Sequence, residues 1–172
     1  MRKATAAAGT SIFFALAPSV VAGLVPWLLT DWEVRGSSGV WPFMRLVGLF
    51  LLVAGAGALV GAFVRFVVEG LGTPAPIAPT ELLVVGGLYR YVRNPMYLAV
   101  VATIVGQALM LGQPVLLPYT VVVALAVGAF VILYEEPTLT RCFGAEYRAY
   151  QRAVPRWVPR LRPWRPDRST RP

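Results

Sequence analysis

The sequence contains no histidine and only one cysteine, Cys142. The first absence removes the commonest metal ligand and the side chain that most often acts as a general base near neutral pH. The second excludes an internal disulfide and a zinc site built from several cysteines. Any chemistry in this chain must therefore proceed without imidazole, and we expect no metal site.

Charge is also scarce, since charged residues make up 14% of the 172 residues, whereas soluble domains carry about 25%. Hydrophobic residues make up 57%, and the mean hydropathy is +0.64. Four apolar segments approach the roughly 17–25 residues that cross a bilayer, and the third is the shortest. They are Ile12–Leu29, Leu46–Val64, Met96–Leu111 and Pro114–Tyr134.

The architecture follows from the lack of backbone partners in lipid, which leaves a helical bundle as the suitable arrangement for these segments. We expect an all-α, polytopic membrane bundle with about four transmembrane helices. Residues 1–165 would form a single domain, and residues 166–172 a disordered tail. Arg2 and Lys3 before the first segment could also mark a signal peptide, but no small-residue cleavage site follows it.

Basic residues are unevenly distributed along the chain. Two of them precede the first segment, and nine arginines lie between Arg141 and Arg171. Connections rich in Lys and Arg stay in the cytoplasm. We therefore expect a multi-pass protein of the inner cell membrane, with both termini and the 69–94 connection cytoplasmic and the 31–42 loop outside.

The arginine-rich tail allows two interpretations. A basic segment could bind nucleic acid, but these arginines alternate with prolines and with Trp157 and Trp164. That pattern is typical of a segment lying on anionic headgroups. We therefore predict a cytoplasmic interfacial tail whose partners are membrane lipids, and no nucleic-acid partner.

A tight helical hairpin is predicted where only Gly112, Gln113 and Pro114 join the third and fourth segments. The hairpin brings the start of the third segment beside the end of the fourth. A basic and aromatic motif, Tyr89–Tyr97, lies at the first of these ends, and an acidic one, Glu135–Glu136, at the second. We expect the two motifs to meet at the cytoplasmic surface.

The first motif has a purely structural interpretation. Asn94 before Pro95 is typical of a helix N-cap with proline at the first helical position, and Arg90 and Arg93 would then be a positive-inside cluster. That interpretation does not explain the three tyrosines between residues 89 and 97. A helix N-terminus beside arginines also suits a carboxylate or a phosphate.

The second motif, Glu135-Glu136, is expected at the end of the fourth helix, next to Pro137. Two carboxylates there would oppose the helix dipole. They could be solvated, they could pair with Arg90 or Arg93, or they could neutralise a cationic ligand. Anionic, cationic and aromatic groups together indicate a pocket for a zwitterion with a positive centre and a flat ring.

A pattern of small residues, Gly57-x-x-x-Gly61, lies on the second segment. Such patterns let a neighbouring helix approach closely. Close packing against a neighbouring helix is the favoured interpretation, and a narrow strip lining a cofactor is the alternative. The same helix face could also support a homodimer.

At these motifs the chain resembles the small integral-membrane methyltransferases of the isoprenylcysteine carboxyl methyltransferase and phospholipid methyltransferase superfamily. The resemblance covers about residues 80–160, in the family's order and spacing. The matching residues are Gly87, Tyr89, Arg93, Asn94-Pro95-Met96-Tyr97, Glu135-Glu136-Pro137, Phe143-Gly144, Glu146-Tyr147, Tyr150 and Val154-Pro155.

The resemblance implies that S-adenosylmethionine binds in a cytoplasm-facing pocket between the helices and that the substrate is lipophilic. It places the cofactor against Leu83, Val84, Tyr89, Asn94, Pro95, Met96 and Tyr97, with its methionine end at Glu135 and Glu136. We expect Arg93 and Glu135 to be catalytic, and Arg90 and Arg93 to bind the substrate head.

Two departures bear on the acceptor. The isoprenylcysteine enzymes carry a histidine at the position of Asn94 and an arginine at that of Val131, whereas the phospholipid N-methyltransferases share residues 94–97 and 134–137. An isoprenylcysteine-like carboxylate and a phospholipid amine both remain candidates. An amine must lose a proton, and glutamate, tyrosine or water would assist it in the absence of histidine.

Two other functions remain as alternatives. One is a non-catalytic membrane module that keeps the cofactor fold and serves binding or assembly. The other is a transporter component, which would require polar residues in mid-membrane, where Gln107 is the one clear example.

Overall fold

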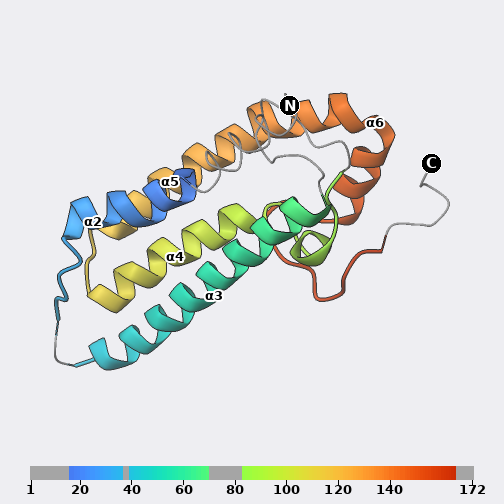
Figure 1. Cartoon of the computed structure of the whole chain (residues 1–172). Coiled ribbons are helices and arrows are strands. Elements are labelled where there is room, and N and C mark those ends of the chain that lie inside the picture. Colours follow the sequence, from blue (N-terminus) through green and yellow to red (C-terminus); the bar gives the residue numbers. More distant parts are fainter. Residues whose placement is uncertain (1–15, 37–38, 70–82, 166–172) are drawn as a thin grey trace.

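The computed structural model describes residues 16–36, 39–69 and 83–165. Every regular element in these ranges is helical (Figure 1). The elements, with η marking π- or 3₁₀-helix, are η1 (Val20–Leu24), α2 (Val25–Thr30), α3 (Trp41–Glu69), η2 (Gly87–Arg90), α4 (Pro95–Leu111), α5 (Leu116–Phe130), η3 (Val131–Glu135) and α6 (Glu136–Ala153). The predicted all-α fold class is confirmed.

Length and composition of the helices fit a membrane bundle. Two helices, Trp41–Ala62 and Leu116–Ala153, are long and apolar enough to cross a bilayer, and Leu16–Thr30 and Pro95–Leu111 are shorter apolar helices. Large apolar side chains cover their outer faces; Phe50, for example, is 70% exposed. In water such a surface would be an aggregation hazard, whereas lipid is its natural solvent.

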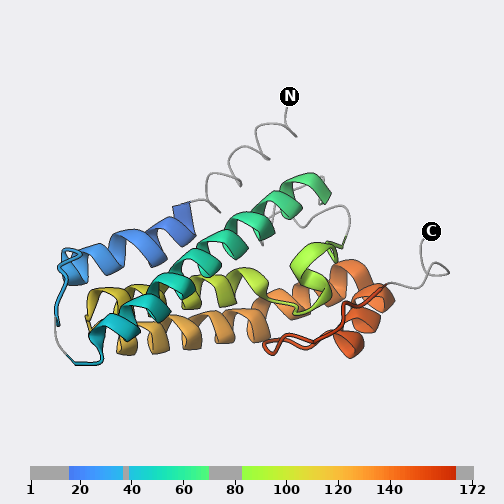
Figure 2. The same cartoon turned by 90° about the horizontal axis from the view of Figure 1, so that it is seen from below.

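The helices α3 and α4 lie side by side along most of their lengths (Figures 1 and 2). Glycines allow this close approach. A Cβ added at Gly106 would lie 2.6 Å from the backbone nitrogen of Leu52, and one added at Gly55 would lie 2.7 Å from Oγ1 of Thr103. Only small residues let helix backbones pack at this distance.

Against the described residues, the predicted close packing of Gly57 and Gly61 on a neighbouring helix is wrong. A Cβ added at either residue would meet no described atom within 4 Å. Both residues lie on an exposed part of α3, so that face does not contact the other described helices. The sequence pattern identified the correct helix but the wrong pair of glycines.

Two side chains attach the first helix to the rest of the bundle. Nε2 of Gln107 donates to the Ala22 carbonyl at 2.6 Å, and the Tyr119 hydroxyl donates to the Val21 carbonyl at 2.8 Å. Both carbonyls belong to the π-turn η1, and in lipid each needs a protein partner. Gln107, on which the transporter interpretation depended, therefore has a structural role.

The predicted hairpin between α4 and α5 is confirmed. The first helix of the pair ends at Gly112, which adopts a left-handed conformation with φ of 67°. Nε2 of Gln113 then donates to the Glu33 carbonyl at 2.8 Å, and the Arg35 N–H donates to the Leu111 carbonyl at 2.7 Å. These bonds close the end of the bundle that lies away from α6 (Figure 1).

The expectation that the fourth helix ends at the two glutamates is wrong. The helix continues through the π-turn η3 into α6, which begins at Glu136 with Pro137 in its first turn. Proline is tolerated in a first turn because its missing N–H needs no partner there, and the π-turn shifts the hydrogen-bond register just before it. The carboxylates therefore lie inside a continuous helix rather than at a C-terminus.

The chain turns back on itself after α6. This helix bends at Gly144, where φ is 51° and ψ is −116°, and residues 154–165 then return toward η2 (Figures 1 and 2). We call residues 154–165 the C-terminal strap. The predicted disordered tail, residues 166–172, lies outside the described residues, as do residues 70–82 of the 69–94 connection and the basic N-terminus.

Candidate functional site

The site begins at the N-terminus of α4. Asn94 occupies the N-cap position and Pro95 the first turn, as predicted, but the Asn94 side chain makes no capping bond. Its Nδ2 instead donates to the Arg156 carbonyl at 3.1 Å. Asn94 is buried, so this bond satisfies an amide that has lost its water and attaches the strap to the start of α4.

The two glutamates have different partners. The Tyr97 hydroxyl donates to Oε2 of Glu135 at 2.9 Å. Nη1 of Arg93 donates to Oε1 of Glu136 at 2.8 Å. The hairpin thus brings the two predicted motifs together. Three interpretations of the glutamates were left open, and Glu136 follows the one in which a glutamate pairs with Arg93.

A second arginine, Arg156, binds Glu136 from the strap. Its Nε donates to Oε1 at 2.6 Å and its Nη2 to Oε2 at 2.8 Å, in a bidentate arrangement. The Arg156 side chain is 34% exposed, whereas those of Arg93 and Glu136 are 10% and 12% exposed. The carboxylate raises the pKa of the Arg156 guanidinium, mainly through these hydrogen bonds. Two arginines therefore share one largely buried acid.

The tyrosine side chain of η2 forms the inner wall of the site. Tyr89 is 7% exposed and packs with Ala62, Val84 and Met96. Burial raises the pKa of the Tyr89 hydroxyl well above its usual value, and the nearby Glu135 carboxylate adds to the effect. Tyr89 therefore stays neutral at any physiological pH.

The C-terminal strap holds η2 and the start of α4 from the other side. The Arg93 N–H donates to the Pro155 carbonyl and the Arg160 N–H to the Tyr91 carbonyl, both at 2.9 Å. The Trp164 ring lies 5.4 Å from that of Tyr150. Further contacts come from the Tyr150 hydroxyl, which donates to the Tyr89 carbonyl at 2.6 Å.

Arg90 faces the strap rather than the glutamates. Its Nε donates to the Trp164 carbonyl at 2.7 Å, and the Trp164 N–H donates to the Arg90 carbonyl at 2.9 Å. The structure therefore separates Arg90 from Arg93, although the sequence placed both at the substrate head. The sequence analysis did not identify Arg156 as a partner of Glu136. Its only signal was its position directly after Val154-Pro155, which belongs to the family resemblance, and the surrounding tail had been assigned to lipid headgroups.

The donor and acceptor groups of the site fit the methionine end of S-adenosylmethionine better at Glu135 than at Glu136. In the described part of the chain, Tyr97 occupies one oxygen of Glu135 and no group is bonded to the other. Glu136 is engaged by two arginines. A carboxylate with an open oxygen beside neutral tyrosines can accept an ammonium group and stabilise a nearby positive centre.

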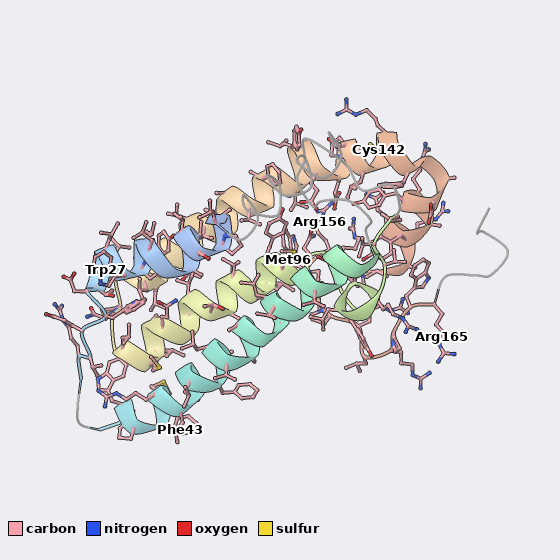
Figure 3. The ribbon with its side chains drawn as sticks, in the orientation of Figure 1. Trp27, Phe43, Met96, Cys142, Arg156 and Arg165 are labelled. Carbon is pink, nitrogen blue, oxygen red and sulfur yellow. The ribbon has the colours of Figure 1, made fainter. Side chains whose placement is uncertain are left out.

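The remaining predicted cofactor contacts lie in the part of the molecule that contains Tyr89 and the start of α4. Met96 and Arg156 are at the same end of the bundle, and Trp27 and Phe43 are at the opposite end (Figure 3). Val84, Asn94 and Met96 are buried, and Leu83 packs against the cluster of Tyr147, Tyr150 and Val154. Their contact with a cofactor stays a prediction.

Comparison with known families gives one match. A family model described as phospholipid methyltransferase matches residues 43–146, well over half of the chain. The matched range contains α3 from its third residue onward, η2, α4, α5 and both glutamates. No curated protein and no solved structure gives a significant match to the chain.

Proposed function

This chain belongs to the phospholipid methyltransferase family, and from that premise we propose that it transfers a methyl group from S-adenosylmethionine to a lipophilic acceptor at the cytoplasmic membrane face. The family match confirms the resemblance that the sequence motifs indicated, and it indicates a membrane methyltransferase. The assignment of the cofactor is carried by one observation. Glu135 has one open carboxylate oxygen, its other oxygen is bonded to the half-buried Tyr97, and the buried Tyr89 lies nearby.

In this proposal Glu135 binds the positively charged end of the cofactor, and Tyr97 fixes the rotamer of that carboxylate through a 2.9 Å hydrogen bond. The cofactor supplies an already activated methyl group, so the protein contributes orientation and electrostatics. Glu136 holds Arg93 in place. Arg93 then presents positive charge to the acceptor's head, and an acceptor amine loses its proton to Glu135 or water.

The acceptor enters from the bilayer in this proposal, and the strap rests on the membrane surface. Support comes from the apolar side chains Val158 and Leu161, which are 72% and 99% exposed. Exposed aliphatic residues between arginines suit contact with anionic lipid headgroups. Membrane lipids, rather than nucleic acid, are the proposed partners of the basic tail.

Binding of S-adenosylmethionine by the purified protein in detergent, measured by calorimetry, tests the proposal. We expect micromolar binding by the wild type. Glu135→Gln should weaken binding roughly 10- to 100-fold, because it removes a charge-assisted hydrogen bond worth about 1.5–3 kcal/mol. Tyr97→Phe should have a smaller effect, since it removes only the bond that orients the carboxylate.

The matched control is Cys142→Ser on the exposed side of α6, which should leave cofactor binding unchanged. A wild type that binds should then transfer labelled methyl to a component of a lipid extract. Absence of binding by a folded wild type would reject methyl transfer and favour the non-catalytic membrane module. Substituting Glu135 alone leaves the ion pairs of Glu136 with Arg93 and Arg156 intact, so a loss of binding does not come from breaking them.

The proposed orientation can be tested with the native cysteine. Cys142 is a free, exposed thiol on α6, on the side that we propose to be cytoplasmic. A membrane-impermeant maleimide should label this thiol in inside-out vesicles. The labelled fraction in intact cells should be at least about tenfold lower. Cys142→Ser gives the background labelling. Labelling of intact cells but not of inside-out vesicles would place α6 on the outer side and overturn the proposed orientation.

A further inference from the structure

Two glycines in the interior of α3, Gly57 and Gly61, have no packing role in the described fold. A Cβ at either would meet nothing within 4 Å, whereas one at Gly48 or Gly55 would collide with α4. Glycine inside a helix costs about 1 kcal/mol relative to alanine. Glycine in a membrane helix commonly serves the close approach of another group.

The two glycines differ in what lies beside them. Gly61 forms one wall of a pocket of about 370 Å³, and the opposite walls come from η2 and the residue that follows it. Gly57, one helical turn earlier, does not line the pocket. The lining residues are Gly61, Gly87, Leu88, Arg90 and Tyr91. The missing side chain at position 61 therefore leaves this pocket open.

Arg90 gives the pocket its charge. Its Nε is bonded to the Trp164 carbonyl at 2.7 Å, which fixes the plane of the guanidinium. Among the described residues, no carboxylate and no other acceptor binds its two terminal nitrogens, and both glutamates of the neighbouring site have other partners. A guanidinium held by its Nε with two free N–H groups matches two oxygens of a phosphate.

The pocket also has an apolar side. Val60 and Val64, on either side of Gly61 along α3, are 62% and 50% exposed. This part of α3 belongs to the outer apolar surface that faces lipid. A ligand that fits both sides must carry a phosphate and hydrocarbon together, which is the chemistry of a membrane phospholipid.

We propose that the pocket between Gly61 and Arg90 holds the phosphodiester of a membrane phospholipid, with the terminal N–H groups of Arg90 donating to its oxygens and an acyl chain lying along α3 at Gly61. The proposal rests on the proposed function, because it assigns the place of the acceptor's phosphate. It also separates two roles. Arg90 holds the phosphate, and Arg93, held by Glu136, faces the remaining part of the acceptor's head.

The position of the pocket relative to Glu135 supports this assignment. Residues Leu88, Arg90 and Tyr91 line the pocket, while Tyr89 in the same short turn is buried with Met96 on the inner side. The turn η2 is thus a shared wall between the lipid pocket and the methyl-donor site. A phospholipid anchored at Arg90 has its headgroup at the edge of that wall.

Lipid binding to the full chain in an uncharged detergent tests the proposal. The probe is phosphatidylethanolamine with a fluorescent acyl chain, and diacylglycerol with the same chain is the phosphate-free control. We expect wild type to prefer the phospholipid. Gly61→Leu, which fills the pocket, and Arg90→Gln, which removes its charge, should each weaken phospholipid binding at least tenfold. Gly57→Leu is the matched control and should bind like the wild type.

Four outcomes would overturn the proposal. Unchanged phospholipid affinity in Gly61→Leu shows that the pocket is not used. Equal affinity of the wild type for diacylglycerol shows that phosphate is not recognised. Displacement of the phospholipid by millimolar inorganic phosphate shows a free-anion site instead. Equal losses in Gly57→Leu and Gly61→Leu, with a halved particle mass by light scattering, show that the face joins two copies of the chain.

Calorimetry with S-adenosylmethionine on the same variants distinguishes this proposal from the proposed function. Gly61→Leu should keep wild-type cofactor affinity, because Gly61 lies outside the Glu135 site. Pocket-dependent lipid binding without any cofactor binding would sustain the lipid site and reject methyl transfer. Cofactor binding with pocket-independent lipid binding would reject the lipid site alone.

Discussion

Replacing Glu136 with glutamine is expected to lower the free energy of unfolding by about 3 kcal/mol. The substitution leaves Arg93 with its side chain only 10% exposed and no counter-charge, and it weakens the bidentate contact with Arg156. Removing one partner of a buried ion pair costs about 3–5 kcal/mol, because the remaining charge has lost its water. Unfolding in mixed detergent micelles, followed by circular dichroism, measures this loss.

Arg156→Gln is the matched comparison for this prediction. Its side chain is 34% exposed, and Glu136 keeps Arg93 as a partner when Arg156 is lost. We therefore expect a loss of only about 1 kcal/mol, as for a partly solvated pair. If Glu136→Gln were no less stable than Arg156→Gln, the Arg93–Glu136 pair would not be what stabilises this end of the bundle.

Ending the chain at Ala153 is expected to weaken binding of S-adenosylmethionine at least roughly 100-fold. The C-terminal strap, residues 154–165, supplies the acceptor for the Arg93 N–H and the donors for the Tyr91 and Arg90 carbonyls. Each such bond contributes about 0.5–1.5 kcal/mol, and about 2.7 kcal/mol in total corresponds to 100-fold in affinity. Without these bonds, η2 and the start of α4 lose the support that positions Tyr97 against Glu135.

The matched control for this truncation ends at Arg165 and keeps every strap contact described above. It should bind the cofactor as the full chain does. Limited proteolysis provides an independent measurement, because cleavage near η2 should appear only in the shorter protein. Wild-type affinity in the chain that ends at Ala153 would show that the strap does not position the site.

Hydropathy and turn chemistry predicted the parts of the fold that depend on local sequence. The apolar runs predicted α3, α4 and α5, and Gly112 predicted the hairpin because a left-handed residue ends α4 there. The meeting of Arg93 with Glu136 followed from that hairpin. Single-sequence periodicity is sufficient for such features, since each depends on a few neighbouring residues.

Other features depend on which distant surfaces meet, and these were predicted wrongly or missed. Glycines occur on several faces of α3, and only the three-dimensional fit shows that Gly55 rather than Gly57 contacts α4. The fourth helix was expected to end at the two glutamates, next to Pro137, because a sequence does not reveal the π-turn before that proline. Arg156 is one of nine arginines in the tail, and only the return of the chain selects it as the partner of Glu136.

The continuous helix from α5 through η3 into α6 relates the depth of the site to the thickness of the bilayer. The 15 residues of α5 and the five of η3 precede Glu136, and at about 1.5 Å per residue they span about 30 Å. That length equals a typical hydrocarbon core. A bilayer a few ångströms thicker would draw Glu135 into hydrocarbon unless the helix straightened, and a thinner one would lift it toward water. The length of this helix therefore fixes the depth of Glu135 relative to the bilayer. We expect the hydration of its carboxylate to depend on the bilayer thickness, and so on the lipid composition of the membrane.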